Sequence, residues 1–351
     1  MSTVFVWATG QDDNLGDSAL RRGYLNALRR RGALVIWRGR ASAGFISGLG
    51  LQIGDSHSGS YFRWYVSALL RAAYSKTEVA VNAGEVPVSR RGALRMATLT
   101  PLILICRLRG GGGLWYGAAV PNPLSNNGFA VPYRIVASIC NVVRVREASS
   151  CLVLGERKLM PDWAFGLGTP TEDWRPIAER PLITLLLRGD RAKPTVEWLT
   201  WFDKLAVELD LTPTVVVQVG RDYLLAQELS DRHAPAEYTA WFVDQHSEQE
   251  STVRDVYSRS AVVVSDRLHA LIFAASEGAV PLGWVESSRG KVASHFDAVG
   301  MDWVGRYEGK TPDSLPILNR SQLDDLLIQL GDRITVARHE LCMLIDDLAL
   351  G

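Results

Sequence analysis

The sequence predicts an α/β protein made of two Rossmann-like domains that face a cleft. Its 351 residues exceed the length that one hydrophobic core usually organises. Short β-branched runs alternate with amphipathic stretches of helical period, which is the pattern of parallel α/β architecture. Residues 168–181 are polar and contain three prolines, and the alternation restarts after them. We therefore expect an N-terminal domain over residues 1–178 and a C-terminal domain over residues 179–351.

The first domain begins with an apolar run that predicts a strand and a polar turn that leads into a helix. The glycine-rich stretch at 110–117 lacks the Gly-Lys-Ser/Thr ending of a P-loop, so we expect it to end a helix and open a strand. The first strand is expected over residues 3–8, and others over residues 33–37, 78–82 and 141–145. Helices are expected over residues 17–31, 61–74, 95–107 and 148–154.

The second domain repeats this alternation and closes with a long helix. Strands are expected over residues 182–187, 214–219, 261–264 and 279–284, and helices over residues 195–208, 222–230, 248–259, 267–276 and 321–348. A further helix is expected to carry Lys291 and His295 on one face. Folds of this class bind ligands at the carboxyl ends of their strands. Polar residues that directly follow a strand are therefore the first candidates for a site.

Composition disfavours several classes of protein. Lys and Arg number 38 and Asp and Glu number 38, so the net charge is zero, which argues against a nucleic-acid binder held by bulk charge. The four cysteines form no CxxC pair, so we expect neither a disulfide framework nor a metal site. The N-terminus has no basic segment before its apolar run, and later apolar runs are too short to span a bilayer. We expect a cytoplasmic protein.

The charge is divided unevenly along the chain. Residues 1–178 carry 21 Lys and Arg against 11 Asp and Glu, whereas residues 179–351 carry 17 against 27. A basic face on the N-terminal domain, including RRGYLNALRRRG at 21–32, would suit the inner membrane surface or an anionic lipid-linked acceptor. A solvated helix face paired across the domain interface is an equally supported interpretation.

The most informative stretch is AVVVSDRLHALIFAASEGAVP, at residues 261–281. An apolar strand leads into Ser265 and Asp266, either of which can cap a helix that begins near Arg267. Arg267 and His269 then lie in the first helical turn, where free N–H groups and the helix dipole favour an anion. The alternative, a capped helix whose histidine packs against a neighbour, is supported about equally by this spacing.

Three motifs resemble the polysaccharide pyruvyltransferase family. SDRLHALIFAASEGAVP, followed by Lys291 ten residues after Pro281, resembles its signature. NLGDSAL at 14–20 resembles its N-terminal turn and helix, and VRVREASSCLVLGERKLMPDWAFGL at 143–167 resembles its strand and following helix. The resemblance covers residues 3 to 305, and the last 45 residues match only as a generic closing helix.

The resemblance implies a glycosyltransferase-B-like enzyme that uses phosphoenolpyruvate as co-substrate and needs no other cofactor. Such enzymes place pyruvate as a ketal across two sugar hydroxyls and release phosphate. The family's donor-binding positions are matched here by Arg188, Arg267, Leu268 and His269. We expect His269 to be the acid that protonates the donor methylene. Lys291 matches a position near the donor, although an ordinary surface lysine is as well supported, and Arg188 has the alternative of a surface loop residue.

Acceptor-side candidates lie in the first half. Asn14, Gly16 and Asp17 occupy the turn after the first strand, and Asn82 and Glu85 follow another strand. These residues could meet sugar hydroxyls at the mouth of the expected cleft, and simple turn chemistry is the better-supported alternative for the first three.

The leading hypothesis is a transferase that acts on a cell-surface polysaccharide, a glycolipid or a lipid-linked precursor. The alternatives are a nucleotide-sugar-dependent glycosyltransferase on the same frame and an inactive sugar-binding protein. The sequence has no DxD pair that would bridge a diphosphate through a metal, and Arg188, Arg267 and His269 are all present.

Overall fold

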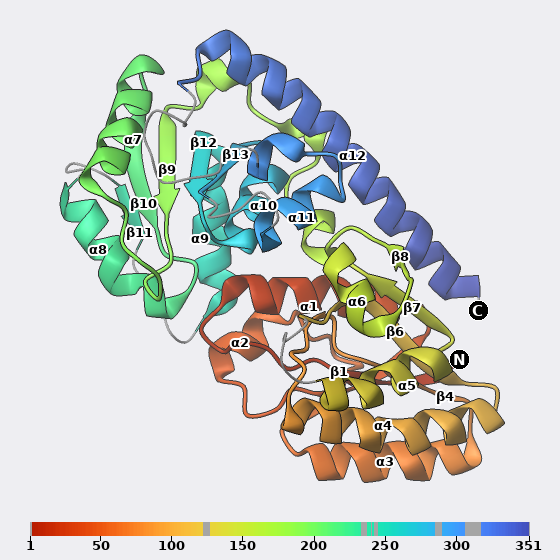
Figure 1. The fold of residues 1–351 in the computed structure, drawn as a ribbon. Helices are drawn as coiled ribbons and strands as arrows, with labels where there is room; N and C mark the ends of the chain where they lie inside the picture. Colours follow the sequence, from red (N-terminus) through yellow and green to blue (C-terminus); the bar gives the residue numbers. More distant parts are fainter. Residues whose placement is uncertain are drawn as a thin grey trace. The chain divides into compact units, whose positions relative to one another are not determined.

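The chain folds into two compact α/β units, each built on a parallel sheet (Figure 1). The computed structural model describes residues 2–121, 127–232, 237–239, 241, 245–284, 290–305 and 317–350. Unit 1 comprises Met1–Asp12, Asp17–Trp163 and Glu340–Gly351, and unit 2 comprises Asp13–Gly16 and Ala164–His339. The expected α/β class with parallel sheets is therefore confirmed.

The sheet of unit 1 has the strand order β3-β2-β1-β4-β6-β7-β8, and β5 pairs with β6. Every pairing is parallel, and the register places β1 between β2 and β4. The strands are β1 (Ser2–Trp7), β2 (Gly32–Trp37), β3 (Ser56–Ser58), β4 (Thr77–Ala80), β5 (Gly84–Glu85), β6 (Gly112–Ala119), β7 (Val142–Val145) and β8 (Lys158–Leu159).

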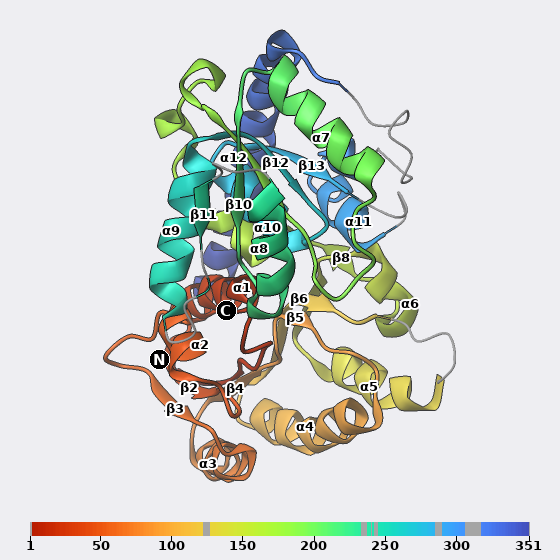
Figure 2. The same ribbon diagram turned by 90° about the vertical axis from the view of Figure 1, so that its left-hand side faces the viewer.

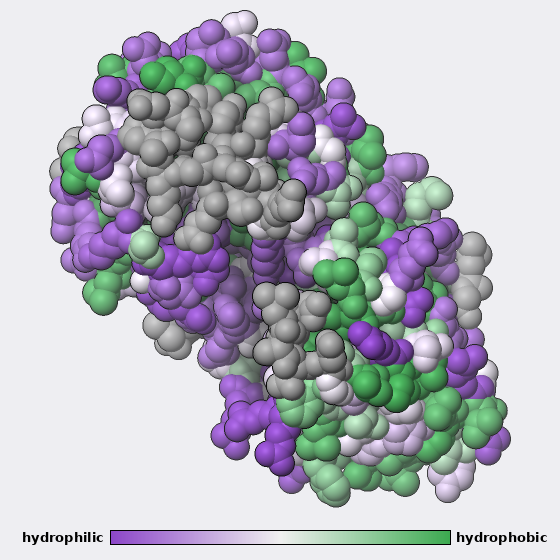
Figure 3. Space-filling view, in the orientation of Figure 1, coloured by the Kyte–Doolittle hydropathy of each residue, from purple (hydrophilic) through white to green (hydrophobic). Residues whose placement is uncertain are grey.

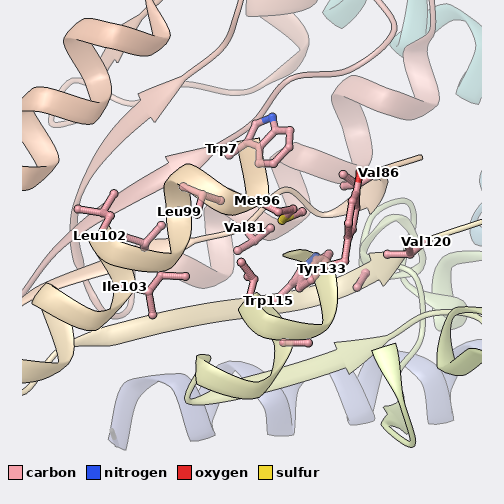
Figure 4. Close-up of a cluster of buried hydrophobic side chains, with 14 of the residues drawn as sticks. Trp7, Val81, Val86, Met96, Leu99, Leu102, Ile103, Trp115, Val120 and Tyr133 are labelled. Carbon is pink, nitrogen blue, oxygen red and sulfur yellow. The ribbon is translucent and has the colours of Figure 1, made fainter. Parts of the chain in front are cut away.

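Helices connect these strands. They are α1 (Leu15–Leu28), α2 (Ala43–Gly48), α3 (Tyr61–Tyr74), α4 (Arg90–Leu108), α5 (Val131–Ile139) and α6 (Cys151–Leu154), with 3₁₀ turns at Asn127–Ala130 and Ala148–Ser150. Side chains from α4 pack on the sheet in a buried cluster that includes Met96, Leu99 and Trp115 (Figure 4). These α4 positions recur every three or four residues, so one face of the helix faces the core.

Unit 2 has a five-stranded parallel sheet in the order β11-β10-β9-β12-β13 (Figure 1). Its strands are β9 (Leu182–Leu186), β10 (Thr212–Val216), β11 (Glu237–Thr239), β12 (Ser260–Ser265) and β13 (Val280–Gly283). Its helices are α7 (Val196–Glu208), α8 (Tyr223–Arg232), α9 (His246–Ser258), α10 (Leu268–Ser276) and α11 (Lys291–Asp297), with 3₁₀ turns at Trp163–Gly166, Thr171–Asp173, Ile177–Glu179, Gly220–Asp222 and Asp302–Gly305.

The final helix, α12 (Arg320–Leu350), runs through the end of unit 2 and into the last segment of unit 1. Apart from the short segment Asp13–Gly16, the chain passes from unit 1 to unit 2 between Trp163 and Ala164, ahead of the proline-containing stretch expected as a linker. That stretch belongs to unit 2, where hydrogen bonds from Arg180 hold it in place. The buried Arg180 guanidinium donates to the backbone carbonyls of Arg175 (2.8 Å), Ser260 (3.1 Å) and Glu277 (3.0 Å).

Most of the expected elements are present, with shifted ends. The helix expected at 17–31 begins at Leu15 and ends at Leu28, and β2 then starts at Gly32. Gly32 has φ of +155°, and a Cβ there would lie 1.9 Å from the carbonyl oxygen of Ser2, so the β1–β2 contact requires glycine. The sequence reading missed six elements, namely α2, α5, β3, β5, β8 and β11.

The expected basic face over residues 21–32 is wrong. Of the five arginines between residues 21 and 32, all within the described part of the chain, only Arg30 is exposed. Arg29 pairs with Asp55, with Nη2 and Oδ2 2.5 Å apart, and Arg31 pairs with buried Glu78. Arg29 and Arg31 lie in the turn after α1, where their guanidinium groups pair with buried carboxylates instead of facing solvent. Among the described residues, no helix combines the length and apolarity that crossing a bilayer requires.

Arg31 joins three parts of unit 1. Its Nε donates to Glu78 Oε2 (2.9 Å) and its Nη1 donates to the Leu348 carbonyl (2.9 Å), while Ser2 Oγ donates to Glu78 Oε2 (3.2 Å). The Glu78 side chain is 1% exposed, so its charge depends on Arg31 for compensation.

We predict that Arg31→Ala destabilises unit 1 by about 3–5 kcal/mol, because it leaves a buried carboxylate unpaired. The adjacent variant Arg30→Ala removes the same side chain from an exposed position and should change the free energy of unfolding by less than about 0.5 kcal/mol. Scanning calorimetry of both variants checks the difference. An equal decrease in unfolding temperature for the two variants would contradict the assignment.

Candidate functional site

Three strands of unit 2 are followed by charged residues at the same edge of its sheet. Strands β10, β9 and β12 are neighbours and run parallel, so their carboxyl ends lie together. Arg188 follows β9, Asp222 follows β10 and Arg267 follows β12. These residues form the core of the candidate site.

The Arg267 guanidinium is held by Asp222 through two hydrogen bonds. Nε donates to Oδ2 at 2.8 Å and Nη2 donates to Oδ1 at 2.5 Å. The side chain of Asp222 is 1% exposed and that of Arg267 is 10% exposed, so water screens this pair little. A two-pronged contact in a buried setting fixes both the position and the plane of the guanidinium.

Two carboxylates also fix the turn that carries Arg188. The backbone N–H of Gly189 donates to Asp222 Oδ1 (2.8 Å), and that of Arg188 donates to Asp266 Oδ1 (2.9 Å). Burial raises the pKa of Asp266 to about 6, while the hydrogen bond from Arg188 and the charge of Arg267 act in the opposite direction. The end of β9 is therefore tied to the ends of both neighbouring strands.

Both arginines converge on a third carboxylate, that of Asp190. Arg188 Nε and Nη2 donate to its two oxygens, each at 2.8 Å, and Arg267 Nη2 lies 3.8 Å from Oδ1. The hydrogen bond from Arg188 holds the pKa of Asp190 well below its ordinary value. Asp190 is 38% exposed, unlike buried Asp222. The two guanidinium groups can therefore share one carboxylate at a place that solvent reaches.

His269 lies in the first turn of α10, directly after Arg267 and Leu268. The expected capping by Ser265 or Asp266 is wrong. Arg267 is itself the N-cap residue, and its side chain makes no capping hydrogen bond, since a guanidinium has no acceptor for a helix N–H. Ser265 Oγ instead accepts the N–H of Arg267 (3.0 Å). Leu268 is buried and contributes apolar packing to unit 2.

Gly16 lies against the His269 ring. A Cβ at Gly16 would lie 2.3 Å from His269 Cβ and 2.5 Å from Nδ1. The segment Asp13–Gly16 belongs to unit 2 and is held there by Asp13, which pairs with Arg221 through Nε and Oδ2 (2.8 Å). Asn14 bridges to Val219, and its Oδ1 accepts the N–H of Gly16 (3.0 Å). Asn14 and Gly16, expected on the acceptor side, therefore lie with the expected donor residues.

Asp17, Asn82 and Glu85 lie in unit 1. The side chain of Arg21 joins the first two, since its Nε donates to Asn82 Oδ1 (3.2 Å) and its Nη1 lies 3.3 Å from Asp17 Oδ1. Asn82 is buried and also donates to the Thr9 carbonyl (3.0 Å), whereas Glu85 is exposed. Asp17 and Asn82 thus have structural partners, and the acceptor roles of all three residues stay predictions.

Lys291 begins α11 and is exposed. Its backbone carbonyl makes a 2.8 Å contact with Nδ1 of His295. Its role near the donor stays a prediction. In the described part of the chain, no group of three or more His, Cys, Asp or Glu side chains is arranged to hold a metal ion.

The sequence reading missed Asp190 and Asp222 as site residues. Both follow strands, as Arg188 and Arg267 do, but the family resemblance named only the two arginines. Their importance comes from the sheet order, which places the end of β10 beside the end of β9 and the end of β9 beside the end of β12.

The fold and the charged sheet edge define an α/β protein of the glycosyltransferase-B type with an arginine-rich candidate anion site in its second unit. The model of the polysaccharide pyruvyl transferase family matches residues 14–282. The chain belongs to this family, which indicates a transferase acting on polysaccharide. No curated protein matches the sequence.

Solved structures support the fold assignment. Anabaena Alr3699/HepE in complex with UDP and glucose is similar at a TM-score of 0.57 and 10% identity, over 100% of this chain and 98% of that chain. A putative UDP-N-acetylglucosamine 2-epimerase from Listeria monocytogenes is similar at a TM-score of 0.54 and 11% identity, over 95% and 91%. At these identities the likeness shows the shared fold.

We predict that Gly16→Ala displaces the His269 ring, because the added methyl group has no room beside it. Overpacking of this kind costs about 1–3 kcal/mol. The matched variant is Gly54→Ala, where a Cβ would meet no atom within 4 Å. Histidine NMR signals should move for Gly16→Ala and stay in place for Gly54→Ala. An unchanged His269 signal in Gly16→Ala would contradict the packing.

Proposed function

We propose that this chain transfers pyruvate from phosphoenolpyruvate to two hydroxyls of a sugar as a ketal and releases phosphate. The acceptor would be a cell-surface polysaccharide, a glycolipid or a lipid-linked precursor of one. The convergence of Arg188 and Arg267 on the carboxylate of Asp190 is the observation that supports this donor most directly. Membership of the polysaccharide pyruvyl transferase family supports the reaction class.

In this proposal, Asp190 occupies the anion position when no donor is bound. Phosphoenolpyruvate carries a carboxylate and a phosphate, and arginine binds both groups through paired N–H donors. The donor would take the place of Asp190, which is partly exposed and sits on a turn. Asp222 would stay in place, because it is buried and also binds the Gly189 N–H.

His269 is the proposed acid. It protonates the methylene carbon of the donor, which becomes a methyl group and leaves an oxocarbenium-like centre at C2. One sugar hydroxyl then forms a bond to C2, the C2–O bond to phosphate breaks, and the second hydroxyl closes the ketal. One hydroxyl proton returns to His269 and replaces the proton that it gave to the methyl group. The other hydroxyl proton leaves with phosphate.

The proposed reaction needs no cofactor besides the co-substrate. The cations that neutralise the donor are supplied by arginines of the chain, and the chemical step is a proton transfer. We place the enzyme in the cytoplasm, at the inner face of the membrane if its acceptor is lipid-linked. Asp17, Asn82 and Glu85 are the proposed acceptor-side residues, and Lys291 is a further proposed donor contact.

We predict that His269→Gln lowers kcat by about 10²- to 10⁴-fold, because a positioned acid contributes on this scale. Phosphate release from phosphoenolpyruvate, measured with a panel of glycosides, gives the rate, and thermal stabilisation by phosphoenolpyruvate reports donor binding. His339→Gln changes an exposed histidine on α12 and should leave both quantities unchanged.

Near-wild-type turnover of His269→Gln with donor binding intact would contradict the acid role. Thermal stabilisation of the wild-type protein by nucleotide sugars but not by phosphoenolpyruvate would overturn the proposed donor in favour of a glycosyltransferase. Stabilisation by a glycan alone would indicate a sugar-binding protein.

We predict opposite effects from two Asp→Asn variants that make the same change in charge. Asp190→Asn releases the two arginines and should tighten phosphoenolpyruvate binding by up to about fivefold, the scale of an exposed ion pair. Asp222→Asn loses the buried support of Arg267 and should weaken binding by at least about tenfold. Isothermal titration calorimetry measures both dissociation constants. Tighter binding in both variants would mean that net charge, not orientation, governs the site.

A further inference from the structure

Helix α4 is apolar on two opposite faces. One face packs into the core of unit 1 through side chains such as Met96 and Leu99. The other carries Leu94, Leu104 and Leu108, which are exposed by 68%, 46% and 84%, together with exposed Ala97 and Pro101. These positions recur at intervals of three and four residues, so they form one stripe along the helix.

Helix α3 extends this stripe. It packs beside α4 through Tyr61, whose hydroxyl lies 2.6 Å from Thr98 Oγ1, and it buries Trp64 in the core. Its outer side presents Phe62, Leu70 and Tyr74, all strongly exposed. Figures 1 and 2 both show α3 and α4 side by side, and Figure 3 shows hydrophobic residues gathered over this part of unit 1. The exposed side chains of α3 and α4 are called the α3–α4 face below.

The α3–α4 face carries positive charge and no negative charge. Neither helix contains an Asp or Glu, and neither does the neighbouring α5. Arginines are exposed beside the apolar side chains, at Arg63 and Arg71 of α3 and at Arg90, Arg91 and Arg107 of α4. An acid-free surface of this composition is complementary to negative charge.

We infer that the α3–α4 face docks on a lipid bilayer that contains anionic lipids. Exposed leucines and aromatic rings enter the boundary of the acyl chains, while arginine side chains extend to the phosphates. A second copy of the same face would bring arginines against arginines, which disfavours a symmetric dimer. The inference does not depend on the identity of the donor, and it moves the basic membrane surface from buried α1 to α3 and α4.

Helix α12 provides a matched control. It exposes Ile328, Val336 and Met343, which are as apolar and as accessible as the leucines of α4. Its sequence also contains six acidic residues, so a bilayer with anionic lipids should not attract it. Substitutions on α12 test whether exposed apolar area alone is sufficient for binding to a bilayer with anionic lipids.

The experiment is co-sedimentation of the full chain with vesicles of phosphatidylcholine alone or of equimolar phosphatidylcholine and phosphatidylglycerol. We expect the wild-type protein to bind the anionic vesicles, with weaker binding at high salt. The combined variant Leu94→Gln, Leu104→Gln and Leu108→Gln should lose at least about tenfold in partition coefficient. Arg63→Gln, Arg71→Gln and Arg91→Gln should together lose about fivefold per arginine on anionic vesicles. The variant Ile328→Gln, Val336→Gln and Met343→Gln should bind as the wild type does.

All substituted side chains are exposed, so circular dichroism should show folded proteins throughout. No binding of the wild-type protein to either vesicle would overturn the inference, as would equal losses in the α4 and α12 variants. If the leucine substitutions instead convert a dimer to a monomer in the absence of vesicles, by sedimentation velocity, the face is an interface between copies. Loss of vesicle binding confined to the leucine and arginine variants of the α3–α4 face supports docking on an anionic bilayer.

Discussion

The buried carboxylate of Asp222 is the contact on which the candidate site depends. It accepts two hydrogen bonds from Arg267 after β12 and one from the N–H of Gly189 after β9, while it follows β10 itself. One side chain thereby fixes the relative positions of three loops that the sheet only brings near one another. An unpaired buried carboxylate is energetically unfavourable, so Asp222 keeps the guanidinium of Arg267 in place before any ligand binds. Asp190 is more exposed than Asp222 and has different partners, so in the proposed function the donor would displace Asp190 and leave Asp222 in place.

The same sheet edge gives the N-terminal motif a physical role. Gly16 leaves room for the His269 ring, and Asp13 and Asn14 hold the segment against the loop after β10. The glycine is therefore required by a close approach between residues more than 250 positions apart in the sequence. Asp17, the next residue, belongs to unit 1 and bonds Arg21 there. A motif that reads as simple turn chemistry thus contributes to the surroundings of the proposed acid.

Sequence patterns predicted the fold class because strand runs and helical periods are local features. Arg267 and His269 stand out at the start of a helix, Arg188 was named by the family resemblance, and the roles of all three stay predictions. The partners of these residues could not be predicted in the same way, since the order β10-β9-β12 decides which loops meet. The pairing of Arg31 with Glu78 was missed because it depends on the order β2-β1-β4 of the other sheet, and the segment 21–32, of whose arginines only Arg30 is exposed, was interpreted as a basic surface.

The α3–α4 face is a second feature that could not be predicted from the sequence alone. A leucine stripe at helical spacing predicts burial, and in α4 two such stripes lie on opposite faces of one helix, of which the sheet can cover only one. Which stripe remains exposed follows from packing against Trp115 and its neighbours, so the sequence alone does not distinguish them. The absence of acidic residues from α3, α4 and α5 is visible in the sequence, but its meaning depends on knowing that these arginines share a surface with exposed leucines. Zero net charge for the whole chain therefore conceals a unit that presents positive charge and apolar side chains together, the combination that an anionic bilayer attracts.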